Sequence, residues 1–110
     1  MFFRAADLGQ VGSLQEILRG DPNLNVNWRN EYDEGSTALI IACLNGHDSI
    51  VSILLAHPDI DVNLKDQDEW TPFLGACFSG STSCARLLLK DSRVMVNEPR
   101  SGYTALLGCF

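Results

Sequence analysis

Long apolar runs are missing from the sequence. No stretch approaches the roughly 18 consecutive apolar residues that a membrane-spanning helix requires. The N-terminus carries Arg4 and Asp7 within its first turns and has no long apolar core, so it lacks the pattern of a signal peptide. We therefore expect an intracellular protein, cytoplasmic or nuclear, that does not bind a membrane.

Basic residues are also few. The 110 residues include 8 Lys and Arg against 14 Asp and Glu, which gives a formal net charge of −6. Sequence-independent binding of nucleic acid needs Lys and Arg to neutralise phosphates, so this balance argues against a nucleic-acid partner. A mildly acidic surface is commonly a solubility feature, and the charge by itself identifies no partner.

Sequence signatures of metal and phosphate sites are absent as well. No Cys-x-x-Cys pair occurs, and a structural zinc site would need four closely grouped Cys and His ligands. The glycine-containing stretch from Gly75 to Gly80 is not followed by Lys-Ser or Lys-Thr, so it does not form a phosphate-binding loop. We expect no metal and no cofactor.

The sequence does contain a repeat with a period of about 33 residues. Thr37 recurs as Thr71 and Thr104, and the Asp-Val-Asn closing at Asn63 has counterparts that close at Asn27 and Asn97. With 45% apolar and 20% charged residues, the chain is typical of a globular protein. We expect a single domain that covers residues 1–110.

Each repeat has the pattern of two short helices. In the second copy, apolar residues fall at helical spacing on either side of Asn45-Gly46, and glycine after an apolar helical run favours a left-handed helix end. These residues are Leu39, Ala42, Cys43, Ile50, Val51, Leu54 and Leu55. Thr71-Pro72 is a typical helix start, and Ser81 or Thr82 can cap the helix after it.

The period, the helix pairs and the residues at fixed positions resemble the ankyrin repeat family. The second copy reads G-S-T-A-L-I-I-A-C, then G-H, I-V, L-L and D-V-N, and the third reads W-T-P-F-L-G-A-C, then G-S, L-L and M-V-N. Two departures stand out. The histidine that the family carries after Thr-Pro-Leu is replaced at Ile40, Leu74 and Leu107, and Glu69 occupies a hairpin position where glycine is expected.

This resemblance implies an all-α, helix-turn-helix solenoid with β-hairpin or turn loops between repeats. The units are expected at residues 1–29, 30–63 and 64–97, with a partial fourth at 98–110. The first unit begins inside its own first helix, as a terminal unit can. The charged stretch from Trp28 to Glu34 is interpreted as an extended hairpin tip.

A catalytic interpretation would have to pair one of the four cysteines with His47 or His57. Cys43 and Cys77 occupy the same inner-helix position in successive units, which favours buried, reduced thiols too far apart to form a disulfide with each other. Cys84 begins an outer helix and could be partly exposed. His47 follows the turn glycine, where its ring is expected to bond to neighbouring backbone. We expect a protein that is not an enzyme.

The remaining candidate for function is the surface. Solenoids of this type bind partners through the hairpin tips and the concave side of the inner helices. Carried over position by position, the resemblance assigns to that face Asp33, Glu34, Ser36, Ile41, Leu44, Asn45, Gln67, Asp68, Trp70, Phe78, Ser79, Arg100, Ser101 and Tyr103.

Trp70 and Tyr103 occupy equivalent tip positions and should be neighbours. Two interpretations of this pair stay open, an aromatic anchor for a partner or simple packing that shields the base of a hairpin. An acidic rim is expected from Asp33, Glu34, Asp66, Asp68 and Glu69.

Two functions remain open at this point. The first is a non-catalytic protein–protein interaction module, and the second is a structural spacer within a longer repeat protein that has no ligand of its own. The fourth unit stops at Phe110, inside its first helix. The chain is therefore either an excerpt of a longer array, with self-association through the uncovered residues Leu106 to Phe110, or an array whose tail packs as a makeshift cap.

Overall fold

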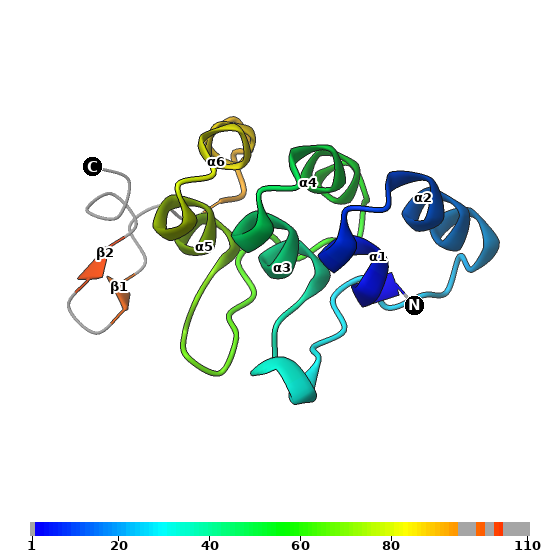
Figure 1. Ribbon diagram of the computed structural model, residues 1–110, viewed down its shortest axis with the longest axis horizontal. Coiled ribbons are helices and arrows are strands. Elements are labelled where there is room, and N and C mark those ends of the chain that lie inside the picture. The colour runs from blue at the N-terminus through cyan, green and yellow to red at the C-terminus, as the bar shows by residue number, and fades with distance from the viewer. Residues whose placement is uncertain (1, 95–98, 101–102, 105–110) are drawn as a thin grey trace.

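Two rows of short helices build the part of the chain that the computed structural model describes, which is residues 2–94, 99–100 and 103–104 (Figure 1). The inner row consists of α1 (Phe2–Leu8), α3 (Ala38–Asn45) and α5 (Pro72–Ser79). The outer row consists of α2 (Val11–Gly20), α4 (Asp48–Leu55) and α6 (Thr82–Leu89). The predicted helix-turn-helix solenoid is confirmed. None of the helices in the described residues is long and apolar enough to cross a membrane.

The loops between units project beyond the inner helices on one side of the array (Figure 1). The first of these tips holds a short 3-10 helix, η1 (Glu31–Asp33), and is closed by a bridge between Asn30 and Ser36. After α6, β1 (Pro99–Arg100) and β2 (Tyr103–Thr104) pair in antiparallel register with Arg100 opposite Tyr103. The expected hairpin loops are therefore present in the described residues.

The inner helices begin and end as their sequences predict. The hydroxyls of Thr37 and Thr71 accept a hydrogen bond from the backbone N–H of the third residue of α3 and α5, each at 3.2 Å. Gly46 and Gly80 end the same helices with φ of 74° and 73°. Ser81 occupies the predicted N-cap position of α6, but its hydroxyl makes no cap bond and lies 2.8 Å from that of Ser79.

The core runs along the array between the two rows. α3 packs against α1, α4 and α5, so the central unit is covered on both sides. Ile40 and Leu74, which replace the family's histidine, are fully buried. Apolar packing thus takes the place of that histidine's hydrogen bonds. Each fully buried aliphatic side chain of this size contributes about 1.5–3 kcal/mol relative to exposure.

Polar side chains connect each turn to the preceding unit. His47 Nε2 lies 2.9 Å from the carbonyl oxygen of Asp7, and Asn45 Nδ2 donates to the same oxygen at 3.1 Å. One unit later, Ser79 Oγ donates to the carbonyl of Cys43 at 3.2 Å. The last carbonyls of a helix lack partners within that helix, so these bonds satisfy them and tie the units together. The predicted backbone contact of His47 is confirmed.

The recurring asparagines also bridge neighbouring units. Asn27 donates from Nδ2 to the carbonyl of Asp59 at 2.8 Å and accepts from the N–H of Asp61 at 2.8 Å. Asn63, its counterpart, donates to the carbonyl of Arg93 at 2.7 Å. The valines before them, Val26 and Val62, are buried. The Val-Asn closing therefore supplies one core residue and one inter-unit bridge in each of the first two copies.

The fourth unit falls largely outside the described residues. Leu106 to Phe110, on which the predictions of self-association and of a makeshift cap depend, are among the residues whose structure is not described. Both predictions stand as stated from the sequence.

Gly9 provides a test of the contact between units. Its φ is +71°, and a Cβ built on it would lie 2.8 Å from the His47 ring. Gly9→Ala should therefore lower the free energy of unfolding by more than the 1–2 kcal/mol or so that the left-handed backbone alone costs. Adding His47→Ala should recover the part due to the clash. Chemical denaturation measures both changes.

Gly12→Ala is the matched control, because nothing lies within 4 Å of a Cβ at that helical glycine. It should leave stability unchanged or raise it by up to about 1 kcal/mol. Because Gly80 has a similar φ of +73° and nothing within 4 Å of a Cβ, a loss from Gly80→Ala equal to that from Gly9→Ala would show that the His47 contact adds nothing to the cost.

Glu69 provides a second test, since it adopts φ of 66° where the resemblance led us to expect glycine. Glu69→Gly should raise the free energy of unfolding by about 0.5–1 kcal/mol, because the left-handed cost of a side chain exceeds the entropic cost of glycine. Gln67→Gly, in the same tip but without a positive φ, should lower it. A loss of stability in both variants would contradict the argument.

Candidate protein-interaction surface

Two inner helices and one tip carry apolar side chains that are partly or largely exposed, and we call this set the inner stripe: Ile41, Leu44, Trp70 and Phe78. Ile41 and Leu44 are half-buried and lie one turn apart on α3. The Cγ and Cδ2 atoms of Leu44 lie 3.4 Å from where a Cβ of Gly75 would be, so Leu44 leans across onto α5. The absence of a side chain at Gly75 makes room for this contact.

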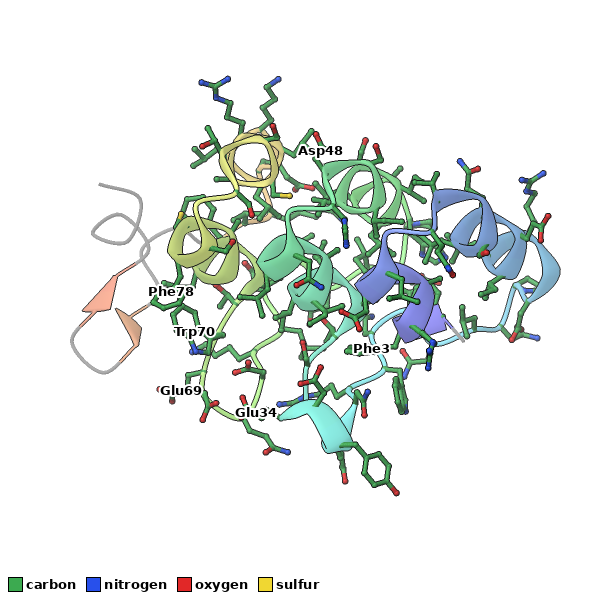
Figure 2. The ribbon with its side chains drawn as sticks, in the orientation of Figure 1. Phe3, Glu34, Asp48, Glu69, Trp70 and Phe78 are labelled. Atoms are coloured by element: carbon green, nitrogen blue, oxygen red, sulfur yellow. The ribbon has the colours of Figure 1, made fainter. Side chains whose placement is uncertain are left out.

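Phe78 is the most exposed member of the inner stripe. Its side chain is 65% exposed, and its ring packs edge-on against Trp70 with centroids 5.0 Å apart (Figure 2). Trp70 is half-buried and packs against the core. An aromatic edge contact of this kind contributes about 0.5–1.5 kcal/mol beyond the buried area. Trp70 therefore holds Phe78 in place while leaving much of its ring open to solvent.

The Trp70 backbone is fixed by the turn in front of it. Asp66 Oδ1 accepts hydrogen bonds from the N–H groups of Asp68 and Trp70, each at 2.9 Å, and Asp66 donates its own N–H to the Trp70 carbonyl at 3.0 Å. Asp66 is buried, at 7% exposure. Its expected place in an acidic rim is therefore wrong, because its carboxylate is used inside the turn.

The other four acidic side chains of the expected rim are exposed. Asp33 and Glu34 lie on the first tip and Asp68 and Glu69 on the second, and Figure 2 shows Glu34 and Glu69 on the same side of the molecule as Trp70. A hydrogen bond and repulsion from Asp68 raise the pKa of Glu34, with smaller contributions from Asp66 and Asp33. The two tips thus bring carboxylates close enough to disfavour their joint ionisation.

Of the remaining described residues predicted for the binding face, one is buried and three are exposed. Ser36 is buried at 4% exposure, away from the surface, and its hydroxyl donates to the Thr37 carbonyl. Asn45 and Ser79 are exposed but make the inter-unit bonds described above. Gln67 is exposed, and its N–H donates to the Glu34 carbonyl at 2.8 Å, which joins the two tips.

The predicted residues of the fourth unit are described less fully. Arg100 and Tyr103 pair across the β1–β2 hairpin, but their side chains fall outside the description, as does Ser101. The predicted contact between Trp70 and Tyr103 is accordingly not tested. In the described residues the ring partner of Trp70 is Phe78.

A second aromatic group was missed from the sequence. Phe3 and Trp28 pack edge-on with ring centroids 6.2 Å apart, beside a hollow of about 530 Å³ at the N-terminal end of the array. Its lining includes Phe2, Phe3, Ile17, Leu24 and Trp28. A signal existed, because Trp28 follows the Val-Asn closing at the position that Leu64 occupies in the next unit.

The cysteines correct two expectations. Cys84, expected to be partly exposed, is fully buried because it faces Cys43 across the core. Contact with Cys84, together with burial, raises the pKa of the Cys43 thiol well above its usual range. Cys43 and Cys84 are free, but Cys77 is disulfide-bonded, so the expectation of reduced cysteines is wrong for that residue. Spacing along the sequence does not determine disulfide pairing.

Both histidines bond to backbone groups. His47 binds the Asp7 carbonyl, and His57 Nδ1 accepts the N–H of Asp59 at 3.1 Å. Across residues 2–94, 99–100 and 103–104, no three His, Cys, Asp or Glu side chains are grouped so as to hold a metal ion. The surface features of the described residues are the apolar inner stripe and the acidic tips.

Curated proteins share this sequence pattern. The chain is 39% identical over 101 residues to the probable E3 ubiquitin-protein ligase XBOS31 of Oryza sativa subsp. japonica, covering 90% of the chain and 22% of that protein. It is 38% identical over 65 residues to SMC5-SMC6 complex localization factor protein 1 of Bos taurus, covering 59% of the chain and 6% of that protein. The chain thus spans less than a quarter of either relative.

A solved structure and a family model agree with the fold. The crystal structure of the human ASB11 ankyrin repeat domain superposes with a TM-score of 0.70 at 30% identity, over 81% of this chain and 38% of that one. The family model for ankyrin repeats in three copies matches residues 2–100. With nearly the whole sequence matched and the helix pairs, caps and turn glycines in place, this chain belongs to the ankyrin repeat family.

Proposed function

We propose that this ankyrin array is a non-catalytic interaction module that binds a partner protein through its concave face and hairpin tips. The observation that carries the proposal is Phe78, a large apolar side chain that is 65% exposed on an inner helix. Exposed apolar residues that stand singly need no explanation, but the Phe78 ring contacts that of Trp70, and Leu44 of the neighbouring inner helix packs over Gly75, one turn before Phe78.

The rigidity of this surface supports the same proposal. Leu44 is seated over Gly75, and the Trp70 backbone is held by Asp66, so neither side chain has to be ordered when a partner arrives. Ordering a side chain at an interface costs about 0.5–1.5 kcal/mol. A preformed apolar surface flanked by polar tips also resembles the core-and-rim arrangement of protein interfaces.

The family supports the general part of the proposal, since ankyrin repeats are protein-interaction modules. Relatives with regulatory or adaptor names include Rabankyrin-5 of Homo sapiens and protein phosphatase 1 regulatory subunit 12A of Mus musculus, which are 32% and 34% identical to the chain over 89 and 71 residues. The chain covers 7% of each of those two proteins. We infer the binding mode for this chain from its own surface.

Phe78→Ala tests the proposal. The immobilised Phe78→Ala variant should bind the proteins that the wild-type chain retains from a cell lysate roughly tenfold more weakly. A tenfold loss of affinity corresponds to about 1.4 kcal/mol of binding free energy. Quantitative mass spectrometry of the retained proteins measures the change. The thermal unfolding midpoint should fall by only a few degrees, because Phe78 is largely exposed and the substitution removes mainly its contact with Trp70.

Leu89→Ala is the matched control, because Leu89 is a similarly exposed apolar residue, at 55%, on the outer helix α6. It should retain the wild-type set of proteins. Equal retention by all three forms would contradict binding through the concave face. Failure of the intact array to retain any protein specifically would favour the structural spacer.

A further inference from the structure

The inner stripe lies next to the acidic tips. Trp70 belongs to the second tip itself, directly after Glu69, and its ring contacts the exposed Phe78. Figure 2 shows Glu69 and Glu34 on the same side of the molecule as Trp70 and Phe78. A partner that covers Phe78 therefore meets the carboxylates as well.

The tips carry an excess of negative charge. Residues 29–36 and 64–70 together hold six carboxylates against two cations, Arg29 and Lys65. Arg29 turns toward the backbone, where its Nε donates to the Gly35 carbonyl at 3.3 Å. Even with both cations counted, the two tips keep a formal net charge of −4, and the carboxylates of Asp33, Glu34, Asp68 and Glu69 are exposed.

Glu34 and Asp68 form a pair of like charges within this acidic region. The two side chains come from successive tips, which are joined by the bond from the Gln67 N–H to the Glu34 carbonyl. Their proximity raises the pKa of Glu34. A cation placed between like charges relieves their repulsion, so the two tips favour a positively charged group.

Building on the proposed function, we propose that the inner stripe and the four exposed tip carboxylates together bind a basic segment of a partner protein, in which Arg or Lys side chains flank an apolar side chain. The apolar side chain would pack on Leu44 and Phe78. An Arg or Lys would lie against the aromatic rings and the carboxylates of Asp68 and Glu69. A guanidinium suits both environments, since it stacks on rings and bonds to carboxylates in pairs.

Charge distinguishes this occupant from the others. A second copy of the chain would bring its own net charge of −6 to an already acidic surface. Nucleic acid would bring phosphates to the same carboxylates. Only a partner segment of opposite charge gains from both the apolar and the acidic parts of the surface.

Selection of peptides provides the test. A displayed library of random peptides of about 12 residues is selected against the immobilised full chain, and enriched peptides are synthesised with a fluorescent label for anisotropy titration. We expect enrichment of Arg and Lys beside apolar residues. Raising the salt from about 0.1 to about 1 M, which shortens the Debye length from about 10 to about 3 Å, should weaken binding at least severalfold.

Two variants separate the parts of the surface. Glu34→Gln with Asp68→Asn should weaken the selected peptides about tenfold, and Phe78→Ala should do the same. Glu16→Gln with Asp48→Asn removes the same charge from exposed positions on the outer helices and should leave affinity within about twofold at the same salt of about 0.1 M, where charges beyond the Debye length are largely screened. Circular dichroism and thermal unfolding establish that each variant is folded.

The outcomes distinguish this inference from the proposed function. Peptides that depend on Phe78 but bind the Glu34→Gln, Asp68→Asn variant as tightly as wild type would overturn the basic-segment inference and leave concave-face binding supported. Enriched peptides without Arg or Lys would do the same. Peptides insensitive to Phe78→Ala, or a selection that enriches none, would overturn both proposals.

Discussion

Stacking of one helix pair on the next is the constraint on which this array depends. α3 contacts α1 on one side and α5 on the other, and such close approach of inner helices requires small residues where they meet. Ala42, Cys43 and Ala76 meet that requirement and are almost completely buried. Since each unit contacts only its neighbours, the stability of the array is approximately a sum of unit and interface contributions. The bonds from His47, Asn45 and Ser79 belong to those interfaces.

The same constraint leaves one face of the inner helices free to vary. Residues between the rows are committed to the core, whereas one equivalent position in successive units holds acidic Asp7, aliphatic Leu44 and aromatic Phe78. Leu44 rests on Gly75 and Phe78 on Trp70, so contacts between neighbours shape this surface without fixing its composition. Specificity for a partner can therefore change in this family without loss of the fold, because scaffold and surface occupy different positions of the repeat.

Most of the scaffold could be predicted because it depends on local chemistry. Thr71-Pro72 starts a helix and Gly80 ends one for reasons contained in the residues themselves, and the repeat period indicates how such pieces follow one another. The bonding partners of individual side chains were harder to predict, since they depend on the register between units. The sequence does not show that Cys84 faces Cys43, that Asp66 turns inward to bond Trp70, or that Ser81 bonds Ser79 in place of its own helix. Each of these contacts depends on a residue that is distant in sequence or on a turn that can adopt several conformations.

Two tip positions carry glutamate where the backbone conformation favours glycine, and these glutamates add negative charge to the surface. Glu34 and Glu69 both adopt positive φ, a conformation that favours glycine, and both place a carboxylate on an exposed turn. A side chain in that conformation costs about 1–2 kcal/mol, and glycine would remove the cost without altering the turn. Backbone strain of this kind is tolerated where surrounding bonds determine the turn, as Asp66 does for the second tip and Asn30 for the first. One of these glutamates, Glu34, makes the contact with Asp68, and the other, Glu69, directly follows Asp68, so the same residues that carry the backbone strain also add to the charge of the tips.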